Sequence, residues 1–204
     1  RPIPRRGPVR RLSSRQVLRL EIQRQALKAW QRTRPAGQVD VVDLGTEFGD
    51  SGGIARDVLG YERATVCGCE LWEPNGSKAG ATGFYDEVFK DDARDFLGRP
   101  DESGRARTFD VAFCCEILEH MPHDDGEKLI RDMIAHLRPG GLILVTAPLG
   151  WMPQGPIDGN PHEVHVSAWD PVELEDLGFV TLAVLPEHRL FVSAYTTANV
   201  EWRA

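Results

Sequence analysis

Residues 39–49 read VDVVDLGTEFG. A run of β-branched residues ends at Asp43, the chain breaks into the glycines Gly45 and Gly49, and residues 51–56 (SGGIAR) follow as a helix start. This pattern predicts a strand, a tight turn and a helix. Glycines let the backbone approach a ligand closely, and a strand-end carboxylate can take a ribose hydroxyl or a cationic amine. The stretch therefore predicts a binding corner for a nucleotide-like ligand.

This corner is unsuited to a dinucleotide. The Gly-x-Gly-x-x-Gly fingerprint is missing, and the carboxylate of Asp43 cannot bind a diphosphate. A ligand with cationic groups suits an acidic strand end better. S-adenosylmethionine is such a ligand, because its amino acid part carries an ammonium and its sulfur is a cation.

Length and composition indicate one domain without a membrane segment. The chain has 204 residues, of which 41% are hydrophobic, and it contains no run of 18 apolar residues. The four cysteines have C-x-C and C-C spacing inside expected strands (Cys67, Cys69, Cys114 and Cys115). That spacing favours reduced core thiols over a zinc site, so we expect a cytoplasmic protein and no membrane partner.

The charge is unevenly distributed along the chain. Residues 1–34 hold eleven Arg or Lys against one acid, a charge of +10, so the rest must carry −17 to give the net −7. We expect a basic N-terminal arm and helix over 1–34 and the binding domain over 35–204. The helix would run from Ser13 or Ser14 to about Trp30, with an apolar stripe that includes Val17, Leu20 and Leu27. The arm either clamps RNA or another anionic substrate, or it is a solvated face over that stripe.

Strands alternate with helices over the rest of the chain. Expected strands are 39–43, 64–70, a short one within 85–93, 109–115 and 142–145, with helices at 51–59 and 124–137 and a short or partly looped one within 73–85. A Pro-Gly-Gly turn at 139–141 stops the helix before the 142–145 strand. A helix to 177 and two strands, 179–185 and 189–196, complete the chain. This predicts an α/β, Rossmann-like, mostly parallel seven-stranded sheet with helices on both faces and an antiparallel C-terminal hairpin.

Two further features point to a ligand site at one end of this sheet. Glu70 ends the second strand 25 residues after Gly45, near the interval at which an acid meets a ribose in nucleotide-binding α/β units. Alternatively, Glu70 is a solvent-exposed carboxylate at the end of a strand. The segment 149–169 is too long for an ordinary connection and is expected to be functional or disordered.

Together with E-x-x-E-H at 116–120 and R-P-G-G at 138–141, these motifs resemble the class I S-adenosylmethionine-dependent methyltransferases. The resemblance spans about residues 39–196. It implies S-adenosylmethionine as cofactor and S-adenosylhomocysteine as product. It also implies a cofactor site in which the glycine loop, the ribose-holding acid, the adenine edge and the end of the fourth strand take part, with residues Asp43, Gly45, Glu47, Gly49, Glu70, Leu71, Asp92, Ala93, Cys115 and Glu116.

The sequence departs from this family at Glu47, which stands where the middle glycine of the loop belongs. Its side chain either crowds the cofactor or offers a carboxylate to the ligand ammonium. A non-catalytic module with a degenerate cofactor loop is therefore one alternative. Gly52 and Gly53 follow closely and can restore the room.

Methyl transfer to a hydroxyl requires a base beside the in-line displacement. His165 and His120 are the candidate catalytic residues. In a second interpretation Glu116, Glu119, His120 and His165 hold Mg²⁺ or Mn²⁺, as in the metal sites of small-RNA 2′-O-methyltransferases and some ubiquinone-pathway O-methyltransferases that this turn resembles. The same turn occurs in metal-free relatives, so we expect no metal. His165 can also act only by fixing its loop through a hydrogen bond.

These observations predict an S-adenosylmethionine-dependent methyltransferase that acts on a small-molecule or glycan hydroxyl. RNA methylation is the alternative within the class; the basic arm favours it and the −17 body opposes it. The sequence does not predict the oligomeric state.

Overall fold

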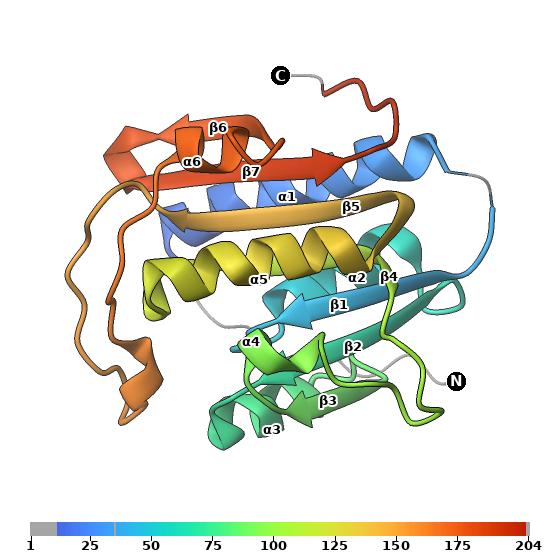
Figure 1. The fold of residues 1–204 in the computed structure, drawn as a ribbon, viewed down its shortest axis with the longest axis horizontal. Coiled ribbons are helices and arrows are strands. Elements are labelled where there is room, and N and C mark those ends of the chain that lie inside the picture. Colours follow the sequence, from blue (N-terminus) through green and yellow to red (C-terminus); the bar gives the residue numbers. More distant parts are fainter. Residues whose placement is uncertain (1–11, 35, 203–204) are drawn as a thin grey trace.

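The computed structural model describes residues 12–34 and 36–202 and contains one seven-stranded sheet (Figure 1). The strands are β1 (Val39–Leu44), β2 (Ala64–Glu70), β3 (Glu87–Lys90), β4 (Phe109–Cys115), β5 (Leu137–Pro148), β6 (Val180–Leu185) and β7 (Leu190–Thr196). They are ordered β3-β2-β1-β4-β5-β7-β6; β1 to β5 run parallel and β7 is antiparallel to both β5 and β6. The predicted Rossmann-like α/β sheet with its C-terminal hairpin is confirmed.

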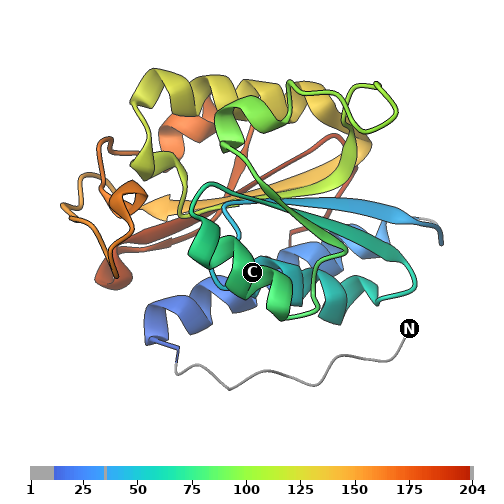
Figure 2. The same ribbon diagram turned by 90° about the horizontal axis from the view of Figure 1, so that it is seen from below.

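Helices cover both faces of the sheet (Figure 2). One face carries α1 (Ser14–Arg32), α2 (Asp50–Leu59) and α3 (Glu73–Ala81), and the other carries α4 (Ala93–Phe96), α5 (His123–His136) and α6 (Pro171–Glu175). Each face has its own buried apolar cluster: Trp30 and Ile54 belong to the first, Leu129 and Ile130 to the second. Burial of these apolar surfaces is the main favourable term that holds the layers together.

Helix α1 differs from its predicted apolar stripe. Ser13 caps it through a capping box with Gln16, as a serine before a helix favours. Its second half packs as expected, with Leu27 and Trp30 fully buried, but Val17 is 50% exposed. The first half instead buries Arg19 and Gln23. The reason is that this half lies over a polar cavity rather than over the apolar core.

The Pro-Gly-Gly segment is also different from the expected turn, because residues 138–141 belong to β5 itself. The register with β4 shifts between Phe109 and Val111, so the glycines form an irregularity inside the ladder. At Gly141 a Cβ would lie 2.7 Å from the Asp110 carbonyl oxygen, which explains the need for glycine there. The helix therefore ends at His136 and the strand starts at once.

The segment 149–169 is held at the end of the sheet where the parallel strands finish (Figure 1). Val166 and Ser167 donate backbone hydrogen bonds to the Glu119 carbonyl, and the Ser167 hydroxyl donates to the Leu118 carbonyl. Trp169 is 2% exposed. The long segment thus packs on the turn that follows β4.

The four cysteines are free thiols. No helix among the described residues combines the length and the apolar character that crossing a bilayer requires. Residues 1–11, the extended part of the basic N-terminal segment for which RNA binding was one interpretation, lie outside the part of the chain that the structure describes.

Candidate functional site

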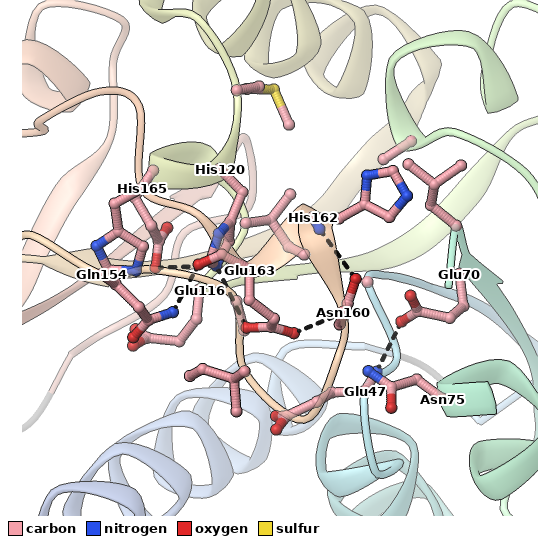
Figure 3. Close-up of a pocket in the computed structure, with 18 of the residues that line it drawn as sticks. Glu47, Glu70, Asn75, Glu116, His120, Gln154, Asn160, His162, Glu163 and His165 are labelled. Atoms are coloured by element: carbon pink, nitrogen blue, oxygen red, sulfur yellow. Dashed lines mark hydrogen bonds and ion pairs between the residues drawn. The ribbon is translucent and has the colours of Figure 1, made fainter. Parts of the chain in front are cut away.

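A cavity of about 330 Å³ lies where β1 to β4 end (Figure 3). Its walls come from the loops after these strands, from the first turns of α1 and from the segment 149–169. Parallel α/β sheets bind ligands at this edge, because the loops that follow the strands converge there. The volume is within the usual range for a small-molecule site.

Most of the predicted cofactor residues line this cavity. Eight of the ten do so: Gly45, Glu47, Glu70, Leu71, Asp92, Ala93, Cys115 and Glu116. Both candidate histidines, His120 and His165, line it as well. Asp43 and Gly49 do not.

Asp43 lies behind the glycine loop, not in the cavity wall. Its side chain is 1% exposed, and the Tyr85 hydroxyl donates a hydrogen bond of 2.5 Å to Oδ2. Burial raises the pKa of Asp43 to about 7, although the bond from Tyr85 opposes the rise. Its contact is therefore with the protein beneath the loop.

Gly49 also acts within the loop. It has φ = 87° as the residue before α2, a backbone conformation that favours glycine. Gly45, with φ = 74°, faces Ile117 so closely that a Cβ would lie 1.8 Å from its Cδ1. The two glycines therefore fix the turn between β1 and α2.

Glu70 presents a carboxylate at the end of β2. The backbone N–H of Trp72 donates to Oε1 at 2.9 Å and that of Glu47 donates to Oε2 at 3.0 Å. Burial raises the pKa of Glu70, and these two backbone bonds counteract that rise. The carboxylate is thus oriented at the cavity by the loops on both sides of it (Figure 3).

Glu47 keeps the loop conformation that a glycine would have. Its φ of 44° lies in the left-handed region, which costs a non-glycine residue free energy. This conformation directs its N–H to Glu70. The departure from the glycine pattern therefore changes the side chain at this position and leaves the turn formed.

Asp92 is the N-cap of α4 and lies at the β3 end of the cavity. Arg94 donates hydrogen bonds to its carboxylate, which lowers the pKa of Asp92. Asp92 is therefore an ionised acceptor beside Ala93 in the cavity wall.

Glu116 follows β4 in a left-handed conformation, with φ = 58°. Its backbone N–H donates to the Thr146 carbonyl, the Thr146 hydroxyl donates to Oε1, and Arg15 of α1 forms an ion pair with Oε2. Arg15 was not predicted to lie at the site, because the arginines of α1 looked like a solvated or RNA-binding face. Only the position of α1 over the cavity reveals its role.

The two histidines have defined tautomers. Nδ1 of His165 lies 2.5 Å from the Met152 carbonyl oxygen, and Nδ1 of His120 lies 3.3 Å from that of Val164. A carbonyl oxygen only accepts, so each Nδ1 carries the proton and each Nε2 keeps its lone pair. Burial lowers the pKa of both rings. Both are therefore neutral near pH 7 and able to accept a proton.

Glu119 stands beside the two rings, whose centroids are 4.8 Å apart in an edge-to-face arrangement. One ligand atom each of Glu119, His120 and His165 lie within 4.8 Å of one another, close enough for a metal ion. Burial and then the neighbouring Glu116 raise the pKa of Glu119 well above its usual range. Glu116, the fourth member of the expected metal set, is instead paired with Arg15.

The segment 149–169 supplies further cavity residues. Met152 and His162 were open to this role from the sequence, and Gln154, Ile157, Asn160 and Glu163 were not assigned one. Asn160 caps a short 3₁₀ turn over Pro161–Glu163 and donates to Glu163 at 3.1 Å, while the Gln154 amide donates to the Glu163 carbonyl. The length of the segment and its histidines signalled a role. Its aperiodic sequence gave no way to tell which side chains turn inward.

Comparison with protein families matches residues 12–193 to the methyltransferase domain model. The match covers the sheet, the cavity and α1. The chain belongs to the methyltransferase domain family. The resemblance to the class I S-adenosylmethionine-dependent methyltransferases and the assignment as an enzyme are thus confirmed, and a non-catalytic module is not supported. Comparison with curated proteins finds no match.

Solved structures share the architecture of this methyltransferase. An S-adenosylmethionine-dependent methyltransferase from Clostridium acetobutylicum has a TM-score of 0.61 at 12% identity, over 88% of this chain and 92% of that one. DhpI, solved with S-adenosylhomocysteine, has a TM-score of 0.56 at 20% identity, over 83% and 82%. The N-terminal domain of EvdMO1, with S-adenosylhomocysteine bound, has 0.61 at 15% identity, over 90% and 84%. At these identities the likeness shows a common fold.

Proposed function

We propose that this methyltransferase moves the methyl group of S-adenosylmethionine to a hydroxyl of a small molecule or a sugar. The observation that carries the proposal is His165, whose Nδ1–H is fixed on the Met152 carbonyl, so that Nε2 keeps its lone pair, in a ring that lines the cavity. A neutral imidazole held in one tautomer is suited to remove a hydroxyl proton. His120 stands against it and helps to define its position.

The cavity fits the cofactor. Glu70, anchored by two backbone N–H groups, can accept hydrogen bonds from ribose hydroxyls, and Asp92 with Ala93 lies at the neighbouring strand end for the base. Glu47 adds a carboxylate that suits the ammonium of the cofactor, and Glu116, paired with Arg15, lines the cavity after β4. Bound S-adenosylmethionine supplies an electrophilic methyl group. Gly45, Leu71 and Cys115 complete the wall of the cavity.

The acceptor end is polar but carries few cations. Gln154, Glu163 and the two histidines face it from the segment 149–169 and the turn after β4, and Asn160 donates to Glu163 from the side of Glu70 (Figure 3). Burial raises the pKa of Glu163. Such donors and acceptors match an uncharged hydroxylated molecule better than a phosphate backbone, which requires several Lys or Arg contacts.

Transfer of a labelled methyl group to chemically matched probes tests the proposal. Purified full chain is incubated with methyl-labelled S-adenosylmethionine and with catechol, a glycoside with free hydroxyls, their fully O-methylated counterparts, an aniline, a thiophenol and bulk RNA. We expect label on the hydroxyl compounds, none on their blocked counterparts, and an O-methyl product by mass spectrometry. Transfer only to nitrogen, sulfur or RNA would refute the hydroxyl assignment.

The measurement with RNA has its own control. Deletion of residues 1–11 removes five arginines. If RNA is the acceptor, binding to RNA weakens with salt and drops in the deleted chain. Methylation of the hydroxyl probes should be unaffected by the deletion, because the cavity residues belong to the remaining chain.

A further inference from the structure

Arg19 of α1 is a buried cation with incomplete hydrogen bonding. It is 7% exposed and lines the cavity beside Gly45 and Cys115. Its guanidinium is 3.6 Å from the carboxylate of Asp50, beyond good hydrogen-bond distance, and its Nε has no hydrogen-bond partner in the described residues. A buried guanidinium left this way is costly, and its planar fork matches a carboxylate.

The neighbourhood of Arg19 holds more polar atoms of this kind. Within the described chain, Oδ1 of Asp43, Oγ1 of Thr46 and Oδ2 of Asp50 are buried and lack hydrogen-bond partners. Asp43 lies at the end of β1, Thr46 in the loop that follows and Asp50 at the first position of α2, and all three lie beside the cavity rather than among the residues that line it. At the other end of the cavity, by contrast, both oxygens of Glu70 are bonded. Together with atoms of Arg15 and Gln23 these groups lie where α1 crosses the glycine loop; the other such atoms in the described chain belong to Arg107, Glu119 and Ser193.

The order of the strands tells which part of the cofactor reaches that end. Side by side in the sheet, the strands have the order β3, β2, β1, β4. Asp92 follows β3, Glu70 ends β2, Gly45 follows β1 and Cys115 ends β4. With the base at β3 and the ribose at β2, the amino acid part lies over β1 and β4. An amino acid end carries one ammonium and one carboxylate. The acids of this region suit the first, and a guanidinium is needed for the second.

We propose that Arg19 binds the α-carboxylate of S-adenosylmethionine in a forked, charge-assisted contact. The assignment rests on the proposed cofactor site. Arg15, four residues earlier on the same side of α1, also has guanidinium nitrogens without a hydrogen-bond partner in the described residues, but its charge is in direct contact with the carboxylate of Glu116, whereas that of Arg19 has only the more distant Asp50. The carboxylates around Arg19 keep it charged: burial lowers the pKa of Arg19, but Glu116, Asp50 and Glu47 more than offset this and the pKa is raised. Arg19 is therefore a specificity residue that distinguishes the whole cofactor from its nucleoside part.

Calorimetric titration of the full chain with two ligands tests this assignment. S-adenosylhomocysteine has the amino acid end, and 5′-methylthioadenosine has the same nucleoside thioether without it. We expect Arg19→Gln to weaken S-adenosylhomocysteine about 10- to 100-fold and 5′-methylthioadenosine by less than about threefold. Arg19→Lys keeps the charge without the fork and should fall between the wild type and Arg19→Gln.

Arg24→Gln is the matched control. Arg24 is on the same helix but bonds to Asp57 of α2 at 2.9 Å, outside the cavity. It should bind both ligands as the wild type does. Thermal unfolding of each variant checks its fold.

The outcomes separate the two levels of the proposal. Failure of the wild type to bind either ligand would overturn the cofactor site itself. Wild-type binding with unchanged S-adenosylhomocysteine affinity in Arg19→Gln, or an equal loss for both ligands, would overturn the role of Arg19 alone. If Arg19→Gln does not fold, the wild type still decides: it should bind decarboxylated S-adenosylmethionine about 10- to 100-fold more weakly than S-adenosylmethionine, and equal affinity contradicts the carboxylate contact.

Discussion

Tyr85 donates a 2.5 Å hydrogen bond to the buried carboxylate of Asp43 beneath the glycine loop. The two residues are 42 positions apart and join the end of β1 to the start of β3. The ring of Tyr85 also fills the space over Gly52 and Gly68, where a Cβ would lie 2.5 Å from its Cζ and 3.1 Å from its Cδ1 respectively. The pair therefore braces the loop from inside the protein.

Asp43→Asn should change how stability depends on pH. The folded-state pKa of Asp43 is about 7, above its ordinary value, so the folded chain holds this proton to a higher pH than the unfolded chain does. Stability is therefore lost as the pH rises toward 7, and the penalty is complete above it. Asparagine has no such proton. The free energy of unfolding of the variant minus that of the wild type should therefore be roughly 2–3 kcal/mol larger at pH 8 than at pH 5.

Denaturant titrations at both pH values measure this difference. Asp176→Asn serves as control, because Asp176 is exposed at the end of α6. A difference between Asp43→Asn and wild type that is the same at pH 5 and pH 8 would contradict a raised pKa at this position.

Asp43 also shows where sequence analysis succeeds and where it stops. Strand alternation and the glycine spacing predicted the sheet and its loops, because these are local patterns with a fixed geometric meaning. The family resemblance added residues of the cavity wall at the strand ends, such as Asp92 and Ala93. They could not show that Asp43 would turn toward Tyr85, since that contact depends on packing between distant strands. The contribution of α1 was hidden for the same reason. Arg15 and Arg19 look like surface charge until the helix is placed over the cavity.

Removing the carboxylate of Glu70 should weaken cofactor binding. Glu70→Ala loses the acceptors proposed for the ribose, and we expect the Kd of S-adenosylhomocysteine to rise about 10- to 100-fold by titration calorimetry. The 2′-deoxy analogue should bind the wild type more weakly than the parent ligand, and Glu70→Ala should discriminate less between the two.

Glu87→Gln is the control for this prediction, because Glu87 is an exposed residue of β3 outside the cavity. The ribose role is untenable if Glu70→Ala binds S-adenosylhomocysteine like the wild type. It is equally untenable if the variant discriminates against the deoxy analogue as strongly as before.

Protonation of His165 should cause the rate of methyl transfer to fall at acidic pH, the acidic limb of the pH–rate profile. Burial lowers the pKa of His165, so its ring stays neutral to a pH below the ordinary imidazole value of about 6.5 and accepts a proton only below that. The single-turnover rate should thus be level from about pH 7 upward and fall on acidification. His165→Gln should lower this rate about 10²- to 10⁴-fold and remove that limb, with the Kd of S-adenosylhomocysteine little changed.

His136→Gln is the control, because it removes a similar contact between a histidine Nδ1 and a backbone carbonyl away from the site. Nδ1 of His136 contacts the Arg107 carbonyl at 2.6 Å at the end of α5, outside the cavity. This variant should keep the wild-type rate and profile. Should His165→Gln retain the acidic limb of the wild type, another group must be the base.

Chelation tests the competing use of the same side chains. Glu119, His120 and His165 are close enough for a divalent ion, but Glu119 is buried beside Glu116 with a raised pKa, and the guanidinium of Arg15 lies on Glu116. Few negative charges thus remain to attract a divalent cation. After dialysis against EDTA, methyl transfer should stay within about twofold of the untreated enzyme, because a histidine base needs no ion. Loss of activity that Mg²⁺, Mn²⁺ or Zn²⁺ restores, with the ion retained by the wild type and released by Glu119→Gln in elemental analysis, would replace the base with a metal centre built on these three residues.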